Sequence, residues 1–277
     1  MLTKAEIQMI RSLGDKRGRQ AEGLFVAEGA KLVTELVAGT LAGGALRVRR
    51  VCCTEEGLKQ LQSGMEKTFA TSKEVQIDMV SQKEMERISF LKTPSALLAL
   101  VEVPRWRMPA TKRDSDLILA LDGVQDPGNM GTILRIADWF GIREVVCSEH
   151  TADCFNPKVV QATMGAIARV RVHYLPLTEW LAQAVQAGVP VYGTFLDGDT
   201  IYDAPLTTGG IVVMGSEGKG VSAQVAALVA HRLYIPSFPA GVPTSESLNV
   251  ATATAIVCSE FRRRCLPFIK VWALLKP

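Results

Sequence analysis

The sequence predicts an α/β protein of two domains, the second of which is built on a parallel sheet. Strand-like hydrophobic runs alternate with helical runs from residue 116 onward, and this alternation produces parallel sheets that helices cover on both faces. Residues 105–115 are dense in charge and contain proline, as linkers are. Three segments place polar groups directly after a strand, at the edge where α/β proteins bind ligands.

Composition limits the class of protein. The chain has 277 residues, of which 48% are hydrophobic and 21% charged, so it can bury a substantial core. The net charge of +3 is too small to indicate a nucleic-acid partner by itself. Basic residues nevertheless cluster at 16–19, 105–113 and 262–264. Such runs are either binding surfaces or solvated faces.

The cysteines point to a reducing compartment. Six are present, but none forms a Cys-x-x-Cys pair or has a histidine at zinc-binding spacing. We therefore expect buried, reduced thiols in a cytoplasmic protein without a metal. The first residues lack an apolar signal core, and no stretch approaches the roughly 20 apolar residues of a spanning helix. We expect no membrane partner.

The first domain, residues 1–104, reads as a small α/β unit. Its predicted helices span 4–13 and 28–38, and its predicted strands span 24–27, 47–54 and 97–103. The second domain, residues 116–277, alternates more regularly. Its predicted strands span 117–124, 144–147, 170–174, 189–195, 210–214 and 232–235. Its predicted helices span 130–140, 157–168, 177–187, 222–230 and 247–263, with Asn156 as the cap of the second.

The first polar segment runs from Asp122 to Arg135. Asp126-Pro-Gly makes a turn after a strand, Asn129 can cap the next helix, and Gly131 permits a close backbone approach. The free N–H groups of a helix start and the guanidinium of Arg135 together suit a phosphate. The alternative is a capped helix whose arginine pairs with a surface carboxylate such as Asp138.

The second segment, Met214-Gly-Ser-Glu-Gly-Lys-Gly220, is dense in glycine. It is not a Walker loop, because Lys219 is followed by glycine rather than by Ser or Thr. It is not a dinucleotide fingerprint either, because the glycines follow the order Gly-x-x-Gly-x-Gly. The segment is therefore a loop whose backbone meets a ligand, with Glu217 as a carboxylate, or a wide turn between strand and helix.

The third segment begins at Ile235-Pro and ends in Ser245-Glu-Ser-Leu-Asn249. Ser247 and Asn249 are good caps for the long helix that follows. They also bring hydrogen-bond donors and acceptors to the edge that Arg135 is expected to occupy. Three such segments at one sheet edge are less easily explained by chance than any one of them.

Taken together, the segments resemble those of the SpoU (TrmH-like) RNA ribose methyltransferases of the SPOUT class. The resemblance rests on the motifs Asn129-x-Gly131-x-x-x-Arg135, Met214-Gly-Ser-Glu-Gly-Lys-Gly220, and Ile235-Pro with Ser247-Leu-Asn249. It covers residues 116–265. The start of the chain is similar to the family's RNA-binding domain, from Lys16-Arg-Gly-Arg to Glu28-Gly29 and again from Thr93 to Leu100.

The resemblance implies a deep trefoil knot around residues 210–260, S-adenosylmethionine as cofactor, and a homodimer. It implies that Gly215, Ile235 and Leu248 hold the adenosyl group, with Thr194 nearby. Lys16, Arg17 and Arg19 would bind RNA. The implied reaction is methyl transfer to a ribose 2′-OH, which needs no metal because the sulfonium already activates the methyl group.

Arg135 resembles the family's catalytic arginine, and Asn129, Glu217, Ser247 and Asn249 would orient it and the substrate. An arginine is a demanding base because its pKa exceeds about 12, so we favour positioning and charge stabilisation. Ribosomal RNA is the expected substrate. The alternatives are the same reaction on transfer RNA, a non-catalytic RNA-binding protein of this fold, and a nucleotide-dependent enzyme, which the glycine spacing disfavours.

Overall fold

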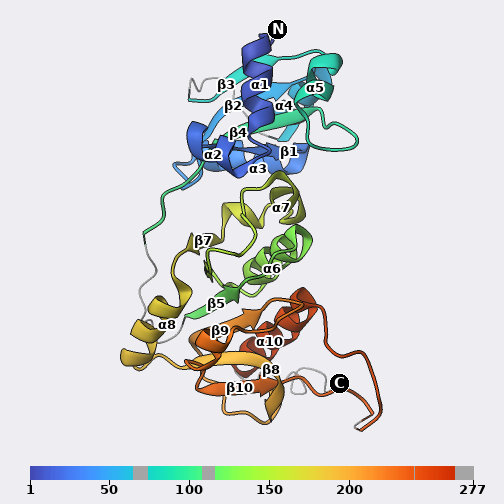
Figure 1. The fold of residues 1–277 in the computed structure, drawn as a ribbon. Coiled ribbons are helices and arrows are strands. Elements are labelled where there is room, and N and C mark those ends of the chain that lie inside the picture. Colours follow the sequence, from blue (N-terminus) through green and yellow to red (C-terminus); the bar gives the residue numbers. More distant parts are fainter. Residues whose placement is uncertain (65–73, 108–115, 240, 266–277) are drawn as a thin grey trace, which may run out of the picture. The chain divides into compact units, whose positions relative to one another are not determined.

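The computed structural model describes residues 1–64, 74–107, 116–239 and 241–265 (Figure 1). Most of the predicted linker, residues 108–115, lies outside them. The described residues form two compact units. The first unit joins residues 1–107 to 126–135 and 152–169, and the second comprises 116–125, 136–151 and 170–265. The N-terminal part of the chain therefore packs with two pieces of sequence that lie beyond the predicted linker.

A mixed four-stranded sheet organises the first unit. Its order is β1 (Leu24–Glu28), β4 (Leu97–Glu102), β2 (Val48–Cys53) and β3 (Gln76–Met79). Strand β4 is antiparallel to both neighbours, whereas β2 and β3 are parallel. The helices are α1 (Lys4–Ser12), α2 (Lys16–Glu22), α3 (Ala30–Leu41), α4 (Glu55–Gly64) and α5 (Gln82–Ile88). The sequence reading missed α2, α4, β3 and α5, which are short or strongly polar.

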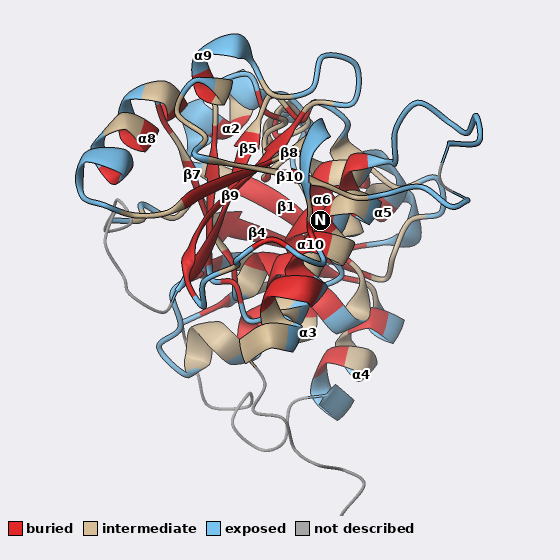
Figure 2. Cartoon of the chain, turned by 90° about the horizontal axis from the view of Figure 1, so that it is seen from below, coloured by how far each residue is buried: buried red, intermediate tan, exposed pale blue. Residues whose placement is uncertain are grey.

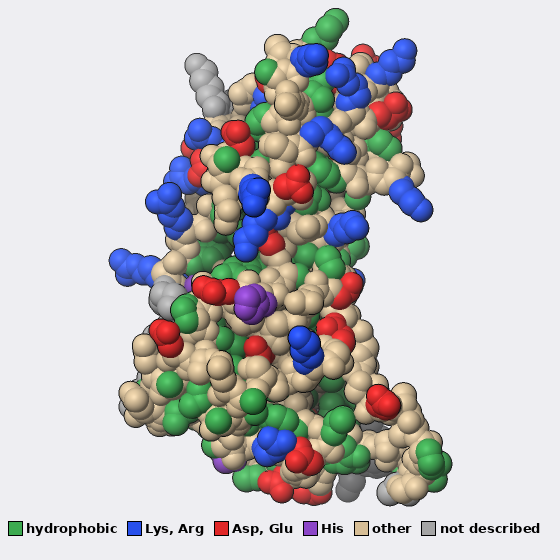
Figure 3. Space-filling view, viewed as in Figure 1, with side chains coloured by type: hydrophobic (Ala, Val, Ile, Leu, Met, Phe, Trp, Pro, Cys, Tyr) green, Lys and Arg blue, Asp and Glu red, His purple; other side chains and the backbone are tan. Residues whose placement is uncertain are grey.

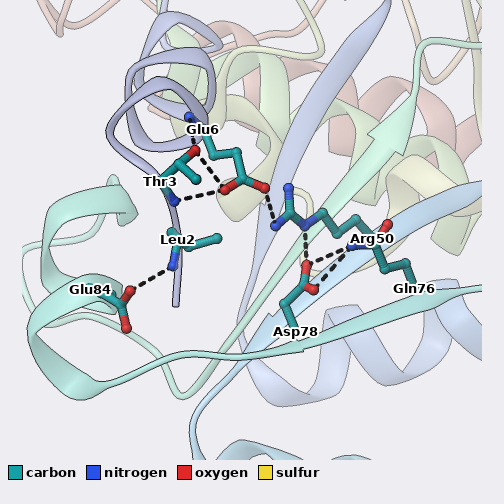
Figure 4. A network of polar contacts seen from close by, with 7 residues as sticks. All are labelled: Leu2, Thr3, Glu6, Arg50, Gln76, Asp78 and Glu84. Carbon is teal, nitrogen blue, oxygen red and sulfur yellow. Dashed lines mark hydrogen bonds and ion pairs between the residues drawn. The ribbon is translucent and has the colours of Figure 1, made fainter.

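A polar network fastens the start of the chain to this sheet (Figure 4). Thr3 and Glu6 form a capping box at α1, and the free carboxylate oxygen of Glu6 accepts a hydrogen bond from Arg50 at 2.7 Å. The guanidinium of Arg50 also pairs with Asp78 on β3. Hydrogen bonds from Thr3 and then from Arg50 lower the pKa of Glu6 to about 2. Arg50 thus links α1, β2 and β3.

A parallel six-stranded sheet organises the second unit, as the sequence predicts. Its order is β10 (His231–Tyr234), β8 (Val191–Thr200), β9 (Gly210–Gly215), β5 (Leu117–Asp122), β6 (Glu144–Cys147) and β7 (Arg171–Tyr174), and every neighbouring pair is parallel. Only the first three residues of β8 are buried. In β9, β5 and β6 every residue but Asp122 is buried (Figure 2). Their near-continuous apolar runs fit a sheet that is covered on both faces.

The helices of this part of the chain are α6 (Pro127–Trp139), α7 (Pro157–Ala162), α8 (Leu177–Gln186), α9 (Ala223–Ala226) and α10 (Val250–Cys265). Helix α7 is shorter than expected because Met164 and Gly165 adopt positive φ, and a short 3-10 turn, η2 (Ala166–Ala168), follows. Asn156 caps α7 as predicted, accepting from the Lys158 amide at 2.9 Å. Trp180 and Leu181 of α8 and Val225 of α9 pack into one core with the strands.

Candidate active site

Three predicted cofactor-binding residues lie in or directly after adjacent strands of this sheet. Thr194 is in β8, Gly215 ends β9, and Ile235 follows β10. Strand β8 lies between β9 and β10, and Thr194 directly follows Gly193, the last residue of β8 before it leaves both ladders. The structure therefore places the three residues at one edge of the paired sheet. The Thr194 hydroxyl lies 3.8 Å from the sulfur of Met214. This edge is where parallel sheets bind their ligands.

Strand β8 leaves its ladder with β10 just after Gly193, so Thr194 is the first residue outside it. Arg232 pairs with Gly193, but the next residue of β10, Leu233, pairs with Asp199, so residues 194–198 bulge out between them. The Arg232 guanidinium lies 3.5 Å from the centroid of the Phe195 ring and forms an ion pair with Asp197. Arg232 therefore braces the segment that carries Thr194, a role that the sequence reading missed.

The glycine loop folds tightly back on itself. Ser216 and Gly220 exchange two backbone hydrogen bonds, and a Cβ on Gly215 would lie 2.2 Å from the carbonyl carbon of Gly220. Only glycine fits at the end of β9. Asp122, which pairs with Gly215 across the sheet, accepts a hydrogen bond from the Ser222 amide at 2.7 Å. Glu217 lies exposed at the tip of this loop.

Asn249 caps α10. Its side-chain oxygen accepts hydrogen bonds from the amides of Ala251 and Thr252 at 3.0 and 3.2 Å. The helix consequently begins at Val250, three residues later than predicted. Ser247 and Leu248 lie in the exposed segment before it. The side-chain oxygen of Asn249 is therefore already bound to the start of the helix. The predicted role of this residue in orienting the substrate has to be compatible with that bond.

Helix α6 carries Asn129 and Arg135. The predicted cap is corrected: Asp126 accepts the Asn129 amide hydrogen at 2.8 Å, so Asn129 lies in the first turn. A Cβ on Gly131 would lie 2.4 Å from the Cβ of Ala162, which confirms that this glycine permits a close approach, here to α7. Arg135 is exposed. Asn129 and Arg135 belong to the first unit, whereas Glu217, Ser247 and Asn249 belong to the second, so their joint action stays a prediction.

Of the three predicted RNA-binding residues, Lys16 and Arg17 are exposed on α2. Arg19 is 3% exposed and does not fit that role. Its guanidinium donates to Asp153 through Nε and Nη2, and to the carbonyls of Leu13 and Gly14 through Nη1. The structure assigns Arg19 to the interior, where it holds the end of α1 against residue 153.

Glu28, in the matched N-terminal motif, is a buried carboxylate. It accepts hydrogen bonds from the Ser89 hydroxyl at 2.6 Å and from the Phe90 amide at 2.7 Å. Burial raises its pKa despite these bonds. Arg11 also donates to the Ser89 carbonyl at 2.8 Å. Glu28 therefore fixes residues 89 and 90, which come just before the second stretch that resembles the RNA-binding domain, Thr93 to Leu100.

The cysteine thiols are mostly buried. All six cysteines are free, and Cys265 alone is not buried; burial raises the pKa of Cys52 and of Cys258 to about 12. Within the described ranges, no three His, Cys, Asp or Glu side chains gather as metal ligands, and no helix there is long and apolar enough to cross a membrane.

The third basic cluster ties α10 down. Arg262 donates to the Phe140 carbonyl at 2.7 Å, and Arg263 and Arg264 both pair with the buried Glu260. Arg264 also donates to the carbonyls of Ile201 and Tyr202. Arg262 and Arg264 are partly buried by these contacts, whereas the side chain of Arg263 is 60% exposed and remains on a solvated face.

Two family models match the chain. The SpoU rRNA Methylase family matches residues 116–259, more than half of the chain, and the MRM3-like substrate binding domain matches residues 4–99. The chain is 29% identical to the 23S rRNA (guanosine(2553)-2′-O)-methyltransferase RlmP of Bacillus subtilis, over 91% of this chain and 94% of that protein.

Solved structures agree. A putative RNA methyltransferase of the TrmH family from Porphyromonas gingivalis is 43% identical, with a TM-score of 0.82, and the match covers 95% of this chain and 99% of that one. An AdoMet-bound rRNA methyltransferase from Sinorhizobium meliloti is 26% identical, with a TM-score of 0.78 and coverage of 96% and 97%. The domain order, the strand-end motifs and these matches agree, and the chain belongs to the SpoU rRNA methylase family.

Proposed function

We propose that this protein transfers a methyl group from S-adenosylmethionine to a ribose 2′-OH of ribosomal RNA. The observation that carries the proposal is the meeting of Thr194, Gly215 and Ile235 at one sheet edge, in a chain of the SpoU family. The similarity to RlmP, which is named for a 23S rRNA ribose, extends over nearly the whole of both chains and supports ribosomal over transfer RNA.

The strand ends fit the adenosyl group. The tight fold of residues 215–220 needs glycine at position 215, and this fold sets the course of the backbone that would contact the cofactor. Ile235 is half-buried and Leu248 is exposed, so both can offer apolar surface to a purine, and Thr194 adds a hydroxyl. The AdoMet-bound relative from Sinorhizobium meliloti supports the same cofactor here. The cofactor supplies an activated methyl group.

The 2′-OH is a poor nucleophile near neutral pH, so its proton must be removed or strongly polarised during attack. We assign Arg135 to the neighbouring phosphate and to the charge that develops in the transition state. Asn129, Glu217, Ser247 and Asn249 orient the arginine and the ribose in this proposal. Arg135 is exposed on α6, as a group that meets an incoming RNA must be.

Charge supports RNA binding by the N-terminal part. Residues 1–107 carry seventeen Lys and Arg against thirteen Asp and Glu, whereas the rest of the chain carries fourteen against fifteen. On the face seen in Figure 3, Lys and Arg side chains gather over the N-terminal elements. Lys16 and Arg17 are exposed members of this set. Their phosphate contacts are expected to be salt-sensitive and blind to sequence.

We further propose the domain boundaries 1–104, 105–115 and 116–277, the trefoil knot over residues 210–260, and a homodimer. The family membership supports all three. Two large apolar side chains of the second unit, Trp139 and Phe238, are 85% and 95% exposed, as residues of an unpaired interface would be. The six reduced cysteines agree with the predicted cytoplasmic location.

The test is methyl transfer from radiolabelled S-adenosylmethionine to unmodified 23S rRNA and to bulk transfer RNA, with mapping of the modified ribose. We expect labelled 23S rRNA carrying a single 2′-O-methyl position. If only transfer RNA were methylated, the substrate would be transfer RNA and not ribosomal RNA. RNA binding without measurable affinity for S-adenosylmethionine, checked by calorimetry, would instead identify a non-catalytic RNA-binding protein.

A further inference from the structure

A cavity of about 420 Å³ opens on the first unit. It is lined by Arg19, Gln20, Glu22, Gly23, Leu24, Arg49, Glu102, Val103 and Arg105. The lining comes from α2, the start of β1, β2, and the end of β4 with the residues after it. Two basic clusters that lie far apart in the sequence, at 16–19 and 105–107, therefore approach one cavity.

The backbone around this cavity is well held. The Val103 amide donates to the Gly23 carbonyl at 2.9 Å, and the Glu102 amide donates to the Arg47 carbonyl at 2.8 Å. Arg19 lines the cavity with a guanidinium whose donors are already bound to Asp153 and to backbone carbonyls. Arg19 thus shapes the cavity and leaves binding to the other side chains.

A β-bulge directs Arg49 outward. Val48 pairs with Val101 and Arg50 with Leu100, so Arg49 is an extra residue between two consecutive pairs. Bulges of this kind re-aim a side chain. Arg50 turns to the network of Figure 4, whereas the side chain of Arg49 is 68% exposed and forms an ion pair with Glu102 at 3.2 Å.

The charged groups are arranged for a nucleotide. Arg49 and Arg105 offer two guanidiniums, which suit a phosphate. Glu22, Glu102 and Gln20 offer hydrogen-bond acceptors. The Watson–Crick edge of guanine carries neighbouring N–H donors, which a carboxylate can accept. Lys16 and Arg17 lie one turn before Gln20 on α2, on the same side of the helix. The volume lies within the roughly 300–1,000 Å³ typical of small-ligand sites.

We infer that this cavity holds one unpaired guanosine nucleotide of the RNA substrate, with Arg49 and Arg105 at its phosphate and Glu22 and Glu102 at its base. The inference rests on the proposed function, because it takes RNA as the substrate. The nucleotide must be unpaired, since base edges within an RNA helix are not accessible to such side chains. The cavity would thus add base recognition to an otherwise sequence-blind basic surface.

The test uses the full chain and two fluorescein-labelled RNAs of roughly 12 nucleotides, a length of the order of a single-strand binding site. One is oligouridine, and the other has one central guanosine. The double variant Arg49→Met/Arg105→Met should bind both RNAs about tenfold more weakly, with the salt slope of log K reduced by about 1.4. Lys31→Met/Lys59→Met is the control, because it removes two exposed charges from α3 and α4 that do not line the cavity. It should change affinity by less than about twofold.

A variant of the two glutamates distinguishes recognition of the guanine base from attraction by the net charge of the surface. If the cavity reads guanine, Glu22→Gln/Glu102→Gln removes the preference for the guanosine-containing RNA. If the surface is only electrostatic, the same variant strengthens binding of both RNAs equally, and the inference fails. Equal losses from the arginine and lysine pairs would also overturn it. Affinity for S-adenosylmethionine, measured by calorimetry, is expected to stay at the wild-type value in every variant. If the wild-type protein itself showed no affinity for S-adenosylmethionine, that result would count against the proposed function and not against this inference.

Discussion

Arg19 and Asp153 form a buried ion pair, with Nη2 of the arginine 2.6 Å from Oδ2 of the aspartate. The two residues are 134 positions apart in the sequence. The side chains are 4% and 18% exposed. The pair joins α2 to the segment before α7 within one unit, and it removes Arg19 from the basic surface that the sequence indicates.

Asp153→Ala is expected to destabilise the protein by about 3 kcal/mol, because it leaves a buried guanidinium without its counter-charge. Urea unfolding measures this. Arg17→Met, two residues from Arg19 but exposed, should change stability by less than about 0.5 kcal/mol while weakening RNA binding. A similar loss of stability from both variants would contradict the division of roles between these neighbours.

Arg135→Ala is expected to lower the rate of methyl transfer by about 10²- to 10³-fold or more, because the charge that stabilises the transition state is lost. Affinity for S-adenosylmethionine should stay nearly unchanged. Arg143→Ala is the matched control, since Arg143 is exposed and belongs to none of the motifs. Single-turnover methylation and calorimetry give the two readouts, and retained turnover in Arg135→Ala would refute the assignment.

Gly131→Ala should cost about 1–3 kcal/mol, because the new Cβ would lie 2.4 Å from that of Ala162 and overpack the α6–α7 contact. Gly39 provides the contrast. It lies inside α3, and a Cβ added to it would meet no neighbouring atom of the described residues within 4 Å. Gly39→Ala should therefore stabilise the protein by up to about 1 kcal/mol through helix propensity. Measured by thermal melting, the Tm of Gly131→Ala should lie below that of the wild type and the Tm of Gly39→Ala above it.

Glu260 makes stability depend on pH. Hydrogen bonds from Arg263 and then from Arg264 lower its pKa to about 2. A carboxylate with a lowered pKa stabilises the folded state above its unfolded pKa of about 4.3, and that stability is lost as pH falls towards 2. Glu260→Gln should therefore be less stable than the wild type at pH 7 by about 1–2 kcal/mol. The difference should vanish near pH 2, and a pH-independent difference would show that packing alone is responsible.

Arg232→Met should weaken binding of S-adenosylmethionine several-fold, because the bulge of residues 194–198 loses its contacts with the guanidinium. Arg232→Lys retains the ion pair with Asp197 and should recover part of the affinity. The rate at saturating cofactor is expected to change less than the KM for the cofactor. If Arg232→Met and wild type bind with equal affinity, the bulge does not need this brace.

Much of the second unit could be predicted from local sequence. Strands β5 and β9 are nearly continuous apolar runs, and Gly123 and Gly215 stand at their ends. Both signals depend only on neighbours along the chain. The first unit was predicted less completely. Helices α2, α4 and α5 are short and polar, and α5 begins at a capping box formed by Ser81 and Glu84, a pattern that the apolar periodicity does not contain.

The sequence alone determined the alternation of strands and helices, the parallel sheet, and the three motifs that identify the family, because all of these are short-range patterns. Only the tertiary structure decided which arginines are available. Arg17 and Arg19 are the same residue type in the same basic cluster. Arg17 is exposed, whereas Arg19 is hydrogen-bonded to Asp153, 134 positions away in the sequence. The same holds for Arg49 and Arg50, which a single bulge directs to different partners. Partner choice depends on contacts between distant segments, and no local pattern encodes them.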